Sequence, residues 1–426
     1  MKTVFKTMMV CGVVAILTLL ECILNSACNL VAYPVPRAAK MIDNTKIEQP
    51  ESLTLFVYMA ADNDLESHAI RNLKAMERAD FSNINVLVLL DRAPGYDQTN
   101  DDWTDTRLFE VSHDTSNNLS IASKRLDCPP LGLTTDSQTE LDMGSFNVLK
   151  TFIEFGKANY KAQNYALIMW GHGTGWRAGP STRAVAIDDT TKSYISVKEL
   201  GAALCGQDLC VIGFDTCFGS TFENLYELKN CAQYITASPS LTPAAGWDYH
   251  ELLNKLGACK LPEEIASVMK DASRQPLTVT KTSELTDIMN CIENFSKSLS
   301  AEITDESARR QVLDNLLNTK SYCYTSFPSD MYIDLFSMAH GFSTSQDEEL
   351  RAASQNLCNA TSGLAIGLLL MPKISDGVLA ACHSPDYIKN DDNQSQCAFI
   401  KDSVWWVPTK NGNSQSLLDK LFYWNF

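Results

Sequence analysis

Short apolar runs of strand length alternate with stretches of helical periodicity along much of this sequence, and this alternation restricts the fold more than any other feature. The apolar runs cover 53–59, 85–90, 166–170, 210–214 and 234–237, and helical spacing marks 140–160, 196–204 and 220–228. A continuous apolar run followed by a helix is typical of a strand that is buried on both faces. The pattern therefore predicts an α/β fold with a mostly parallel sheet flanked by helices on both faces.

The pattern changes beyond residue 260. Helical spacing extends over 285–317 and 332–340, and a last apolar strand is predicted at 363–370. We therefore predict one domain over 52–260 and a C-terminal subdomain of helices and strand over 261–426, packed on the first. Residues 29–51 contain three prolines and no periodicity, so we expect a linker or a short pro-segment there.

The N-terminal residues have the pattern of an export signal. Lys2 and Lys6 precede an apolar run over 8–20, and Ser26 and Ala27 follow it. The run has about 13 residues, short of the ~20 needed to span a bilayer. We predict a signal peptide over 1–28 and a secreted, cell-surface or periplasmic protein. Cys28 is in addition a candidate for lipidation as in a bacterial lipoprotein, although Asn25 stands where that signal usually carries leucine.

The charge balance limits the classes of partner. The chain has 51 acidic and 35 basic residues, a formal net charge of −16. This balance argues against nucleic acid and anionic lipid as ligands. We therefore expect membrane contact only through a lipid on Cys28.

The cysteine count beyond Cys28 is odd. Eleven cysteines remain, at 128, 205, 210, 217, 231, 259, 291, 323, 358, 382 and 397. In an oxidising compartment ten of them could form disulfides, leaving one thiol.

Reactive side chains follow two of the predicted strands. His172, between Gly171 and Gly173, comes directly after the run 166–170, and Cys217 follows the run 210–214 just before a predicted helix. Parallel strands place such residues at one edge of the sheet. An imidazole there can exchange protons near neutral pH, and a helix N-terminus lowers a thiol pKa. Each residue alone is as consistent with a turn or a structural cysteine, but together they predict a Cys/His pair.

The sequence resembles the clostripain family of cysteine peptidases, relatives of caspases, gingipains and legumain. The matching stretches are 57–66, 164–176, 214–217 and 246–249, with weaker similarity at 332–335 and near Gly363 to Pro372. The resemblance implies a caspase-like fold in which 52–260 is the catalytic domain. It also implies that Cys217 attacks the scissile carbonyl to form a thioester, while His172 protonates the leaving amine. The backbone amides of Gly173 and Cys217 would hold the oxyanion.

The resemblance further assigns the substrate pocket. Asp215 stands where the family has the pocket acid, which implies cleavage after Arg or Lys; capping of the next helix is the alternative. Asp248 is a second candidate pocket acid. The segment 237–245 departs from the acidic, glycine-rich stretch of the family, which leaves fine specificity open.

Two further predictions concern processing and metal. Arg183 is the first candidate for self-cleavage between histidine and cysteine, with an ordinary surface arginine as the alternative. Asp62, Asn63, Asp64 and Glu66 resemble the start of a calcium loop, but its later ligands are missing, and helix capping explains them better. We predict no required cofactor and no His/Cys metal site; calcium stays open, without an assigned site.

These observations favour an exported cysteine endopeptidase that acts on proteins or peptides after Arg or Lys. The alternative is a catalytically inactive, caspase-like protein that binds a surface or extracellular partner.

Overall fold

The apolar run that begins the folded part forms the central strand of an eight-stranded sheet. We analysed a computed structural model, which describes residues 51–371 except 117, 137, 176–184, 274 and 324–330, together with 399, 403–405 and 416–422. The predicted signal peptide with Cys28, the linker as far as residue 50, and Arg183 lie outside these residues.

The sheet is mixed and has the strand order β10-β9-β8-β5-β1-β2-β3-β4. Its five central strands are parallel, and β10, β3 and β4 are antiparallel to their neighbours. The strands are β1 (Glu51–Ala61), β2 (Ile84–Arg92), β3 (Arg107–Glu110), β4 (Lys124–Leu126), β5 (Ala162–Trp170), β8 (Leu209–Asp215), β9 (Ala232–Ala237) and β10 (Thr278–Lys281). The five predicted runs correspond to the five parallel strands.

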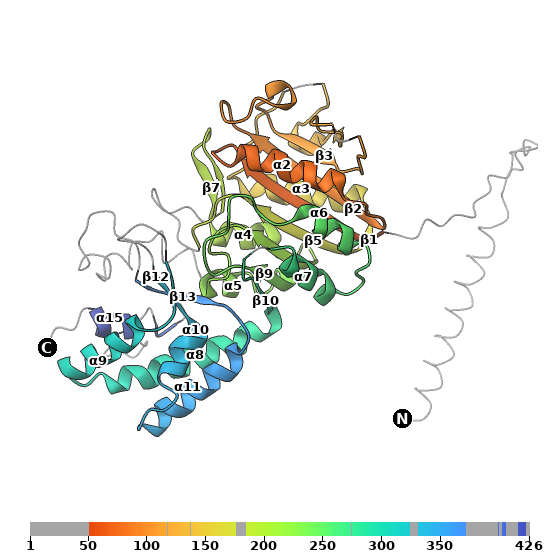
Figure 1. Ribbon diagram of the computed structural model, residues 1–426. Helices are drawn as coiled ribbons and strands as arrows, with labels where there is room; N and C mark the ends of the chain where they lie inside the picture. The colour runs from red at the N-terminus through yellow and green to blue at the C-terminus, as the bar shows by residue number, and fades with distance from the viewer. Residues whose placement is uncertain are drawn as a thin grey trace, which may run out of the picture. The chain divides into compact units, whose positions relative to one another are not determined.

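Helices cover both faces of the sheet (Figure 1). Successive side chains of β1 point to opposite faces, so Phe56 and Tyr58 join one hydrophobic core and Leu55 and Val57 join the other. The first core is closed by α3 (Phe146–Asn159), α4 (Val197–Leu204) and α5 (Phe222–Glu227), and the second by α2 (Glu66–Arg78), α6 (Tyr249–Leu256) and α7 (Pro262–Asp271). The α/β prediction with helices on both faces is confirmed.

The C-terminal part contains helices and a small antiparallel sheet. Within the described residues, its helices are α8 (Leu285–Glu302), α9 (Glu306–Leu317), α10 (Leu335–Gly341), α11 (Glu348–Thr361) and α15 (Leu417–Phe422), and its sheet has the order β11 (Ser321–Cys323), β12 (Met331–Asp334), β13 (Gly367–Met371). The helical prediction for 332–334 is wrong, because β12 pairs with a strand on each side. Both α7 and β10 follow residue 260. Nevertheless, β10 is a strand of the eight-stranded sheet and α7 covers one face of that sheet.

The C-terminal sheet contacts the segment that follows β8. The N–H of Gly367 donates to the carbonyl of Ser220 at 3.0 Å, and the Ser220 hydroxyl donates to the carbonyl of Ala365 at 2.9 Å. Residues 50–426 form one compact unit. Small elements complete it: the hairpin β6 (Val185–Asp188) and β7 (Ser193–Ile195), and the 3-10 turns η1 (Asn100–Asp102), η2 (Pro129–Leu131) and η3 (Thr282–Glu284).

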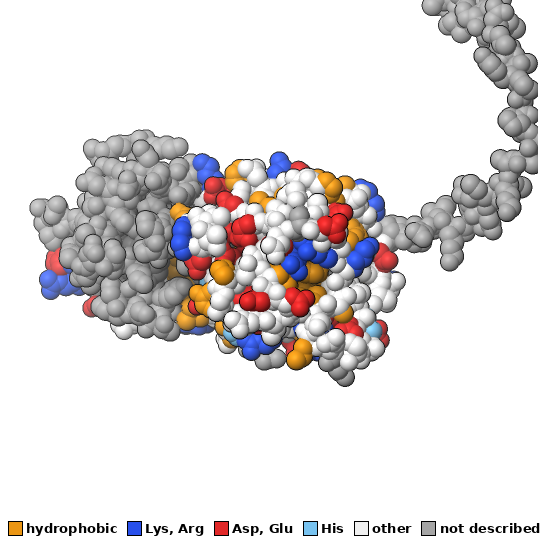
Figure 2. Space-filling model, turned by 90° about the horizontal axis from the view of Figure 1, so that it is seen from above, with side chains coloured by type: hydrophobic (Ala, Val, Ile, Leu, Met, Phe, Trp, Pro, Cys, Tyr) orange, Lys and Arg blue, Asp and Glu red, His pale blue; other side chains and the backbone are white. Residues whose placement is uncertain are grey.

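The surface carries both signs of charge. Figure 2 shows acidic and basic side chains on the same visible face of the described part. None of the described helices combines the length and the apolarity required to cross a bilayer.

Candidate functional site

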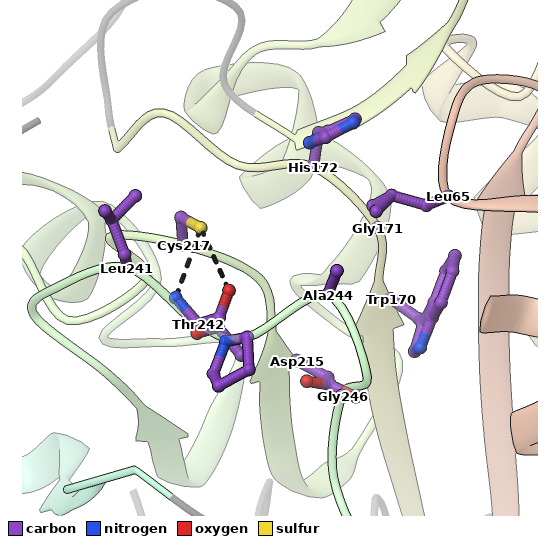
Figure 3. Close-up of a pocket in the computed structure, with 11 residues that line it drawn as sticks. Leu65, Trp170, Gly171, His172, Asp215, Cys217, Leu241, Thr242, Ala244 and Gly246 are labelled. Carbon is purple, nitrogen blue, oxygen red and sulfur yellow. Dashed lines mark hydrogen bonds between the residues drawn. The ribbon is translucent and has the colours of Figure 1, made fainter. Parts of the chain in front are cut away.

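Strands β5 and β8 bring the predicted pair to the same edge of the sheet. Trp170 is in register with Asp215, so Gly171–His172 and Thr216–Cys217 leave the sheet side by side. A cavity of about 200 Å³ opens there (Figure 3). Its lining residues are Leu65, Trp170, Gly171, His172, Asp215, Cys217, Leu241, Thr242, Pro243, Ala244 and Gly246. We call it the dyad cavity.

Gly173 allows the two loops to approach each other. A Cβ atom at this position would lie 2.5 Å from the carbonyl oxygen of Cys217 and 2.9 Å from the side chain of Thr216. Only glycine fits so close to another backbone segment. The two predicted oxyanion residues, Gly173 and Cys217, are therefore adjacent.

The His172 ring is held by an acid that sequence reasoning did not assign. Its Nε2 lies 2.6 Å from Oδ1 of Asp64, in the turn after β1, and 37% of the His172 side chain is exposed. Within the described residues, His172 is not hydrogen-bonded to Cys217. Asp64 thus fixes the orientation of the ring at the entrance of the cavity.

The Cys217 sulfur contacts the loop that follows β9. The N–H of Thr242 donates to the sulfur at 3.2 Å, and the thiol lies 3.7 Å from the Thr242 carbonyl (Figure 3). Burial raises the pKa of Cys217, the N–H of Thr242 lowers it, and the charge of Asp215 raises it. The net shift is upward, so the resting thiol is neutral at pH 7.

The predicted helix N-terminus at Cys217 is wrong. The helix α5 begins at Phe222, five residues further on, and the intervening chain turns through Phe218, which has φ 55°. The N–H of Phe218 donates to the carbonyl of Ser240 at 3.0 Å, which ties this turn to the same neighbouring loop. The helix dipole therefore does not act at the sulfur, because its influence is limited to the first turn.

Asp215 lies at the base of the dyad cavity and is almost fully buried. Its Oδ2 accepts hydrogen bonds from the N–H of Trp247 at 3.0 Å and from the hydroxyl of Tyr249 at 2.9 Å. Its Oδ1 is buried without a partner among the described residues. Burial raises the pKa of Asp215 to about 7, against the lowering effect of these two hydrogen bonds.

Asp248 is not part of this cavity. Its carboxylate caps α6 by accepting the N–H of Glu251 at 3.1 Å, and it lines a separate cavity with His68, Arg71 and His250. The neighbouring Tyr249 contacts Asp215 instead. Sequence reasoning missed Tyr249, and the only available signal was a hydroxyl-bearing side chain within the family-like segment 246–249.

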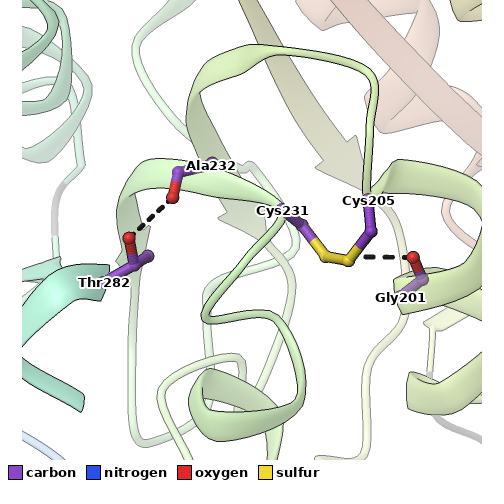
Figure 4. The surroundings of a disulfide bond; sticks show 5 residues. All are labelled: Gly201, Cys205, Cys231, Ala232 and Thr282. Atoms are coloured by element: carbon purple, nitrogen blue, oxygen red, sulfur yellow. Dashed lines mark hydrogen bonds between the residues drawn. A yellow bond between two sulfur atoms is a disulfide. The ribbon is translucent and has the colours of Figure 1, made fainter. Parts of the chain in front are cut away.

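Most of the described cysteines are thiols, so the possibility that all but one cysteine form disulfides does not hold. Cys205 and Cys231 form a disulfide (Figure 4). Six of the other described cysteines are thiols: Cys128, Cys210, Cys217, Cys259, Cys291 and Cys358. Cys128, Cys210 and Cys259 are buried in the cores, where they pack as small apolar side chains do. The odd count therefore does not single out Cys217.

The acids after β1 serve tertiary contacts and not helix capping. The α2 N-cap is Leu65, without a side-chain cap. Glu66 pairs with the buried Arg92, and Asp62 accepts the N–H of Thr190 at 2.7 Å. Carboxylate oxygens of Asp62, Asp91, Glu140 and Asp188 gather within 4.8 Å of one another. We call these four residues the acidic cluster.

Comparison with known proteins identifies the family and the fold. The family profile described as the Clostripain family matches residues 57–403. Clostripain of Hathewaya histolytica is 27% identical over 254 residues, 54% of this chain and 47% of that protein. The chain thus matches about half the length of this relative.

Two solved structures have a similar fold. An inactive zymogen C11 protease from Parabacteroides distasonis has a TM-score of 0.58 and 16% identity, covering 84% of this chain and 99% of that one. A secreted C11 cysteine protease from Bacteroides thetaiotaomicron, in complex with an irreversible peptide inhibitor, has a TM-score of 0.55 and 18% identity, covering 81% and 99%. With the profile match over most of its length, this chain belongs to the clostripain family of cysteine peptidases.

Proposed function

We propose that this protein is an exported cysteine endopeptidase that cleaves after Arg or Lys, with Cys217 as nucleophile and His172 as general acid and base. The observation that carries the proposal is the dyad cavity, which His172, Cys217 and Asp215 line together. Export is inferred from the signal-like residues 1–28.

The first half of the reaction uses the neutral thiol. His172 takes the proton from Cys217, and the sulfur adds to the scissile carbonyl. In this mechanism the oxyanion is stabilised by the N–H of Cys217, which has no hydrogen-bond partner in the described part of the chain, and by the N–H of the adjacent Gly173. The proton then passes from His172 to the leaving amine, which gives a thioester. Water, deprotonated by His172, hydrolyses the thioester and restores the thiol.

Substrate binding requires a rotation or shift of the His172 ring toward Cys217. In the resting structure the ring is held by the exposed Asp64 and the sulfur by Thr242. The contact between His172 and Asp64 joins two exposed side chains and is weak, about 0–1 kcal/mol. Catalytic hydrogen bonds often form only in the substrate complex.

Asp215 supports the preference for a basic residue. A guanidinium or ammonium in the cavity would give Oδ1 of Asp215 the partner that it lacks in the described structure. A neutral side chain would leave this carboxylate desolvated and unpaired, or protonated. Arg and Lys are therefore favoured over an isosteric uncharged side chain.

The test compares peptide reporters that differ only in the residue before the cut: Arg, Lys or norleucine. We expect kcat/KM to be about 10³-fold higher for Arg than for norleucine at pH 8. Dividing kcat/KM for the Arg reporter by kcat/KM for the norleucine reporter removes the pH dependence of the catalytic groups, which is the same for both reporters. This ratio should rise about tenfold per pH unit below pH 7 and level off above, because the pKa of Asp215 is about 7.

Three variants separate the roles. Cys217→Ala should abolish cleavage, and Asp215→Asn should remove most of the Arg preference while sparing norleucine. Asp248→Asn, a nearby acid outside the cavity, should leave the ratio unchanged. Cleavage that survives Cys217→Ala contradicts the mechanism. No cleavage of any reporter by the folded protein would favour the inactive binding protein.

A further inference from the structure

A second cavity adjoins the dyad cavity, on the other side of the segment that follows β9. Its volume is about 440 Å³, and it lies between α2 and residues 245–250. Ala244 and Gly246 line the dyad cavity (Figure 3), whereas Ala245 and Trp247 line the second cavity. One backbone segment is therefore a common wall. We call the second cavity the basic cavity.

Helix α2 also borders both cavities. Leu65, at its N-terminal end, lines the dyad cavity, and His68, about one turn further on, lines the basic cavity. The Asn72 side chain holds the common wall against the sheet, because it accepts the indole N–H of Trp170 at 2.9 Å and donates to the carbonyl of Ala245 at 3.1 Å. A peptide that extends from the dyad cavity over α2 therefore reaches the basic cavity.

Two arginines give the basic cavity its charge. Arg71 and Arg78 lie two turns apart on one face of α2, and the small side chain of Ala75 leaves space between them. Both arginines are exposed, and neither forms a salt bridge with a described residue. Asp248 is the one acid among the described lining residues, and it caps α6. The cavity thus has two guanidinium groups for one carboxylate.

The cavity on the other flank of these arginines is already balanced. It has a volume of about 420 Å³, and its lining adds Lys74, Asp97 and Asp114 to the two arginines. Lys74 forms salt bridges with Glu77 at 2.5 Å and with Asp114 at 3.4 Å. An anion is therefore attracted more strongly to the basic cavity, where fewer acids compete for the guanidinium groups.

Trp247 adds a hydrogen-bond donor to the basic cavity. The side chains of Trp247 and Tyr249 are buried and give the lining an aromatic part. The indole N–H of Trp247 is buried and has no acceptor among the described residues. A buried donor without a partner is costly, so an acceptor that enters the cavity would be favourable. A carboxylate offers such acceptors and also pairs with guanidinium groups in a bidentate geometry.

We propose that the basic cavity binds an acidic side chain of the peptide substrate. This inference rests on the proposed function, because the acidic residue belongs to the same peptide whose Arg or Lys enters the dyad cavity. An extended chain covers about 3.3 Å per residue, and a single backbone segment separates the two cavities. Glu or Asp about two to four positions from the basic residue can therefore reach Arg71 and Arg78. The two neighbouring cavities select opposite charges in one substrate.

The experiment measures peptide binding by fluorescence anisotropy, on the full chain carrying Cys217→Ala so that no peptide is cleaved. The labelled peptides carry a central Arg, and Glu is placed at each other position in turn, with Gln at the same position as the neutral reference. We expect one or two adjacent positions at which Glu binds about tenfold more tightly than Gln in 50 mM NaCl. This Glu/Gln ratio should fall toward one in 1 M NaCl, because salt screens exposed charges.

Variants of the two arginines test the assignment. Arg71→Gln and Arg78→Gln change exposed side chains and are expected to fold normally. Each should lower the Glu/Gln ratio about threefold, and the double variant should bring it close to one. Arg310→Gln is the matched control, because this arginine of α9 is 72% exposed and lies outside the basic cavity. It should leave the ratio unchanged.

A second peptide series separates this inference from the proposed function. Replacing the central Arg by norleucine should weaken the Glu and Gln peptides alike and leave the Glu/Gln ratio unchanged. Norleucine peptides that bind as tightly as Arg peptides would contradict the basic preference of the dyad cavity and not the basic cavity. The inference itself is wrong if Glu binds no more tightly than Gln at every position, or if the double arginine variant keeps the ratio of its parent.

Discussion

Asp215 must be both ionised and buried, and these two requirements conflict in the substrate-free protein. A carboxylate at the base of a cavity recognises a cationic side chain only when it is ionised, but burial raises its pKa to about 7. The same burial makes the interaction selective, since a desolvated acid discriminates strongly between charged and neutral ligands. The residue therefore lowers the stability of the free protein in order to bind its substrate.

The first prediction concerns this cost. In the unfolded chain an aspartate has a pKa near 3.9, so the folded state holds the proton more tightly. Stability is expected to fall as pH rises from about 4 to 7 and to remain reduced above pH 7, on the order of 4 kcal/mol. Asp215→Asn keeps an acceptor for Trp247 and Tyr249 and removes the charge. Urea unfolding should show it more stable than wild type at pH 8 and equal at pH 4.

The outcome that would contradict this is a variant that is less stable than wild type at pH 8. Asp208→Asn provides the control, because Asp208 is 86% exposed and should change stability little at either pH.

Site residues that follow or end a predicted strand could be predicted from the sequence. The residues that contact them could not. His172, Cys217 and Asp215 each follow or end an apolar run, and the order of parallel strands places them together. Asp64, Thr242 and Tyr249 reach them from other loops whose paths depend on tertiary packing. The acidic cluster was missed for the same reason, as its members are separated by tens of residues.

The length of a strand determined whether it could be predicted from the sequence. The five parallel strands are buried on both faces and give continuous apolar runs. Strands of three or four residues, such as β4, β7 and β11, are too short to produce a periodic pattern. The strand β12 was mistaken for the start of a helix because the periodic residues of α10 follow it directly.

The disulfide leads to a prediction about two elements. Cys205 follows α4 and Cys231 precedes β9, with a sequence separation of 26. Closing a loop of this size in the unfolded chain is worth roughly 3 to 4 kcal/mol in the loop-entropy description. The double variant Cys205→Ser/Cys231→Ser should therefore lose about 2–4 kcal/mol of unfolding free energy, measured by urea denaturation.

The reducing agent supplies the control for this prediction. Dithiothreitol should lower the stability of the parent to that of the double variant, since Cys205 is exposed and accessible. The double variant itself should be insensitive. An equal effect of dithiothreitol on both proteins would show that the bond does not form or does not contribute.

At the scale of the whole molecule, the C-terminal part supports both catalytic loops. Tyr332 of β12 is fully buried, and its ring centroid lies 5.5 Å from that of Phe218, next to Cys217. Its hydroxyl donates to the carbonyl of Thr174 at 3.4 Å. A Cβ on Gly175 would lie 2.6 Å from this hydroxyl. One side chain from the C-terminal sheet thus packs against the loops after β5 and after β8.

This contact gives the last prediction, in which Tyr332 is a positioning residue. Tyr332→Ala should cost about 3–5 kcal/mol of stability and should also lower kcat/KM about tenfold or more at temperatures where the variant is folded, because both loops lose a shared support. Tyr332→Phe keeps the ring and should stay within a few-fold of wild type. Phe342→Ala distinguishes support from general destabilisation: Phe342 is buried against Phe295 at 5.7 Å. Phe342→Ala should lower Tm about as much as Tyr332→Ala does and leave kcat/KM unchanged. If Tyr332→Ala and Phe342→Ala reduce kcat/KM equally, the C-terminal sheet stabilises the protein without positioning the dyad.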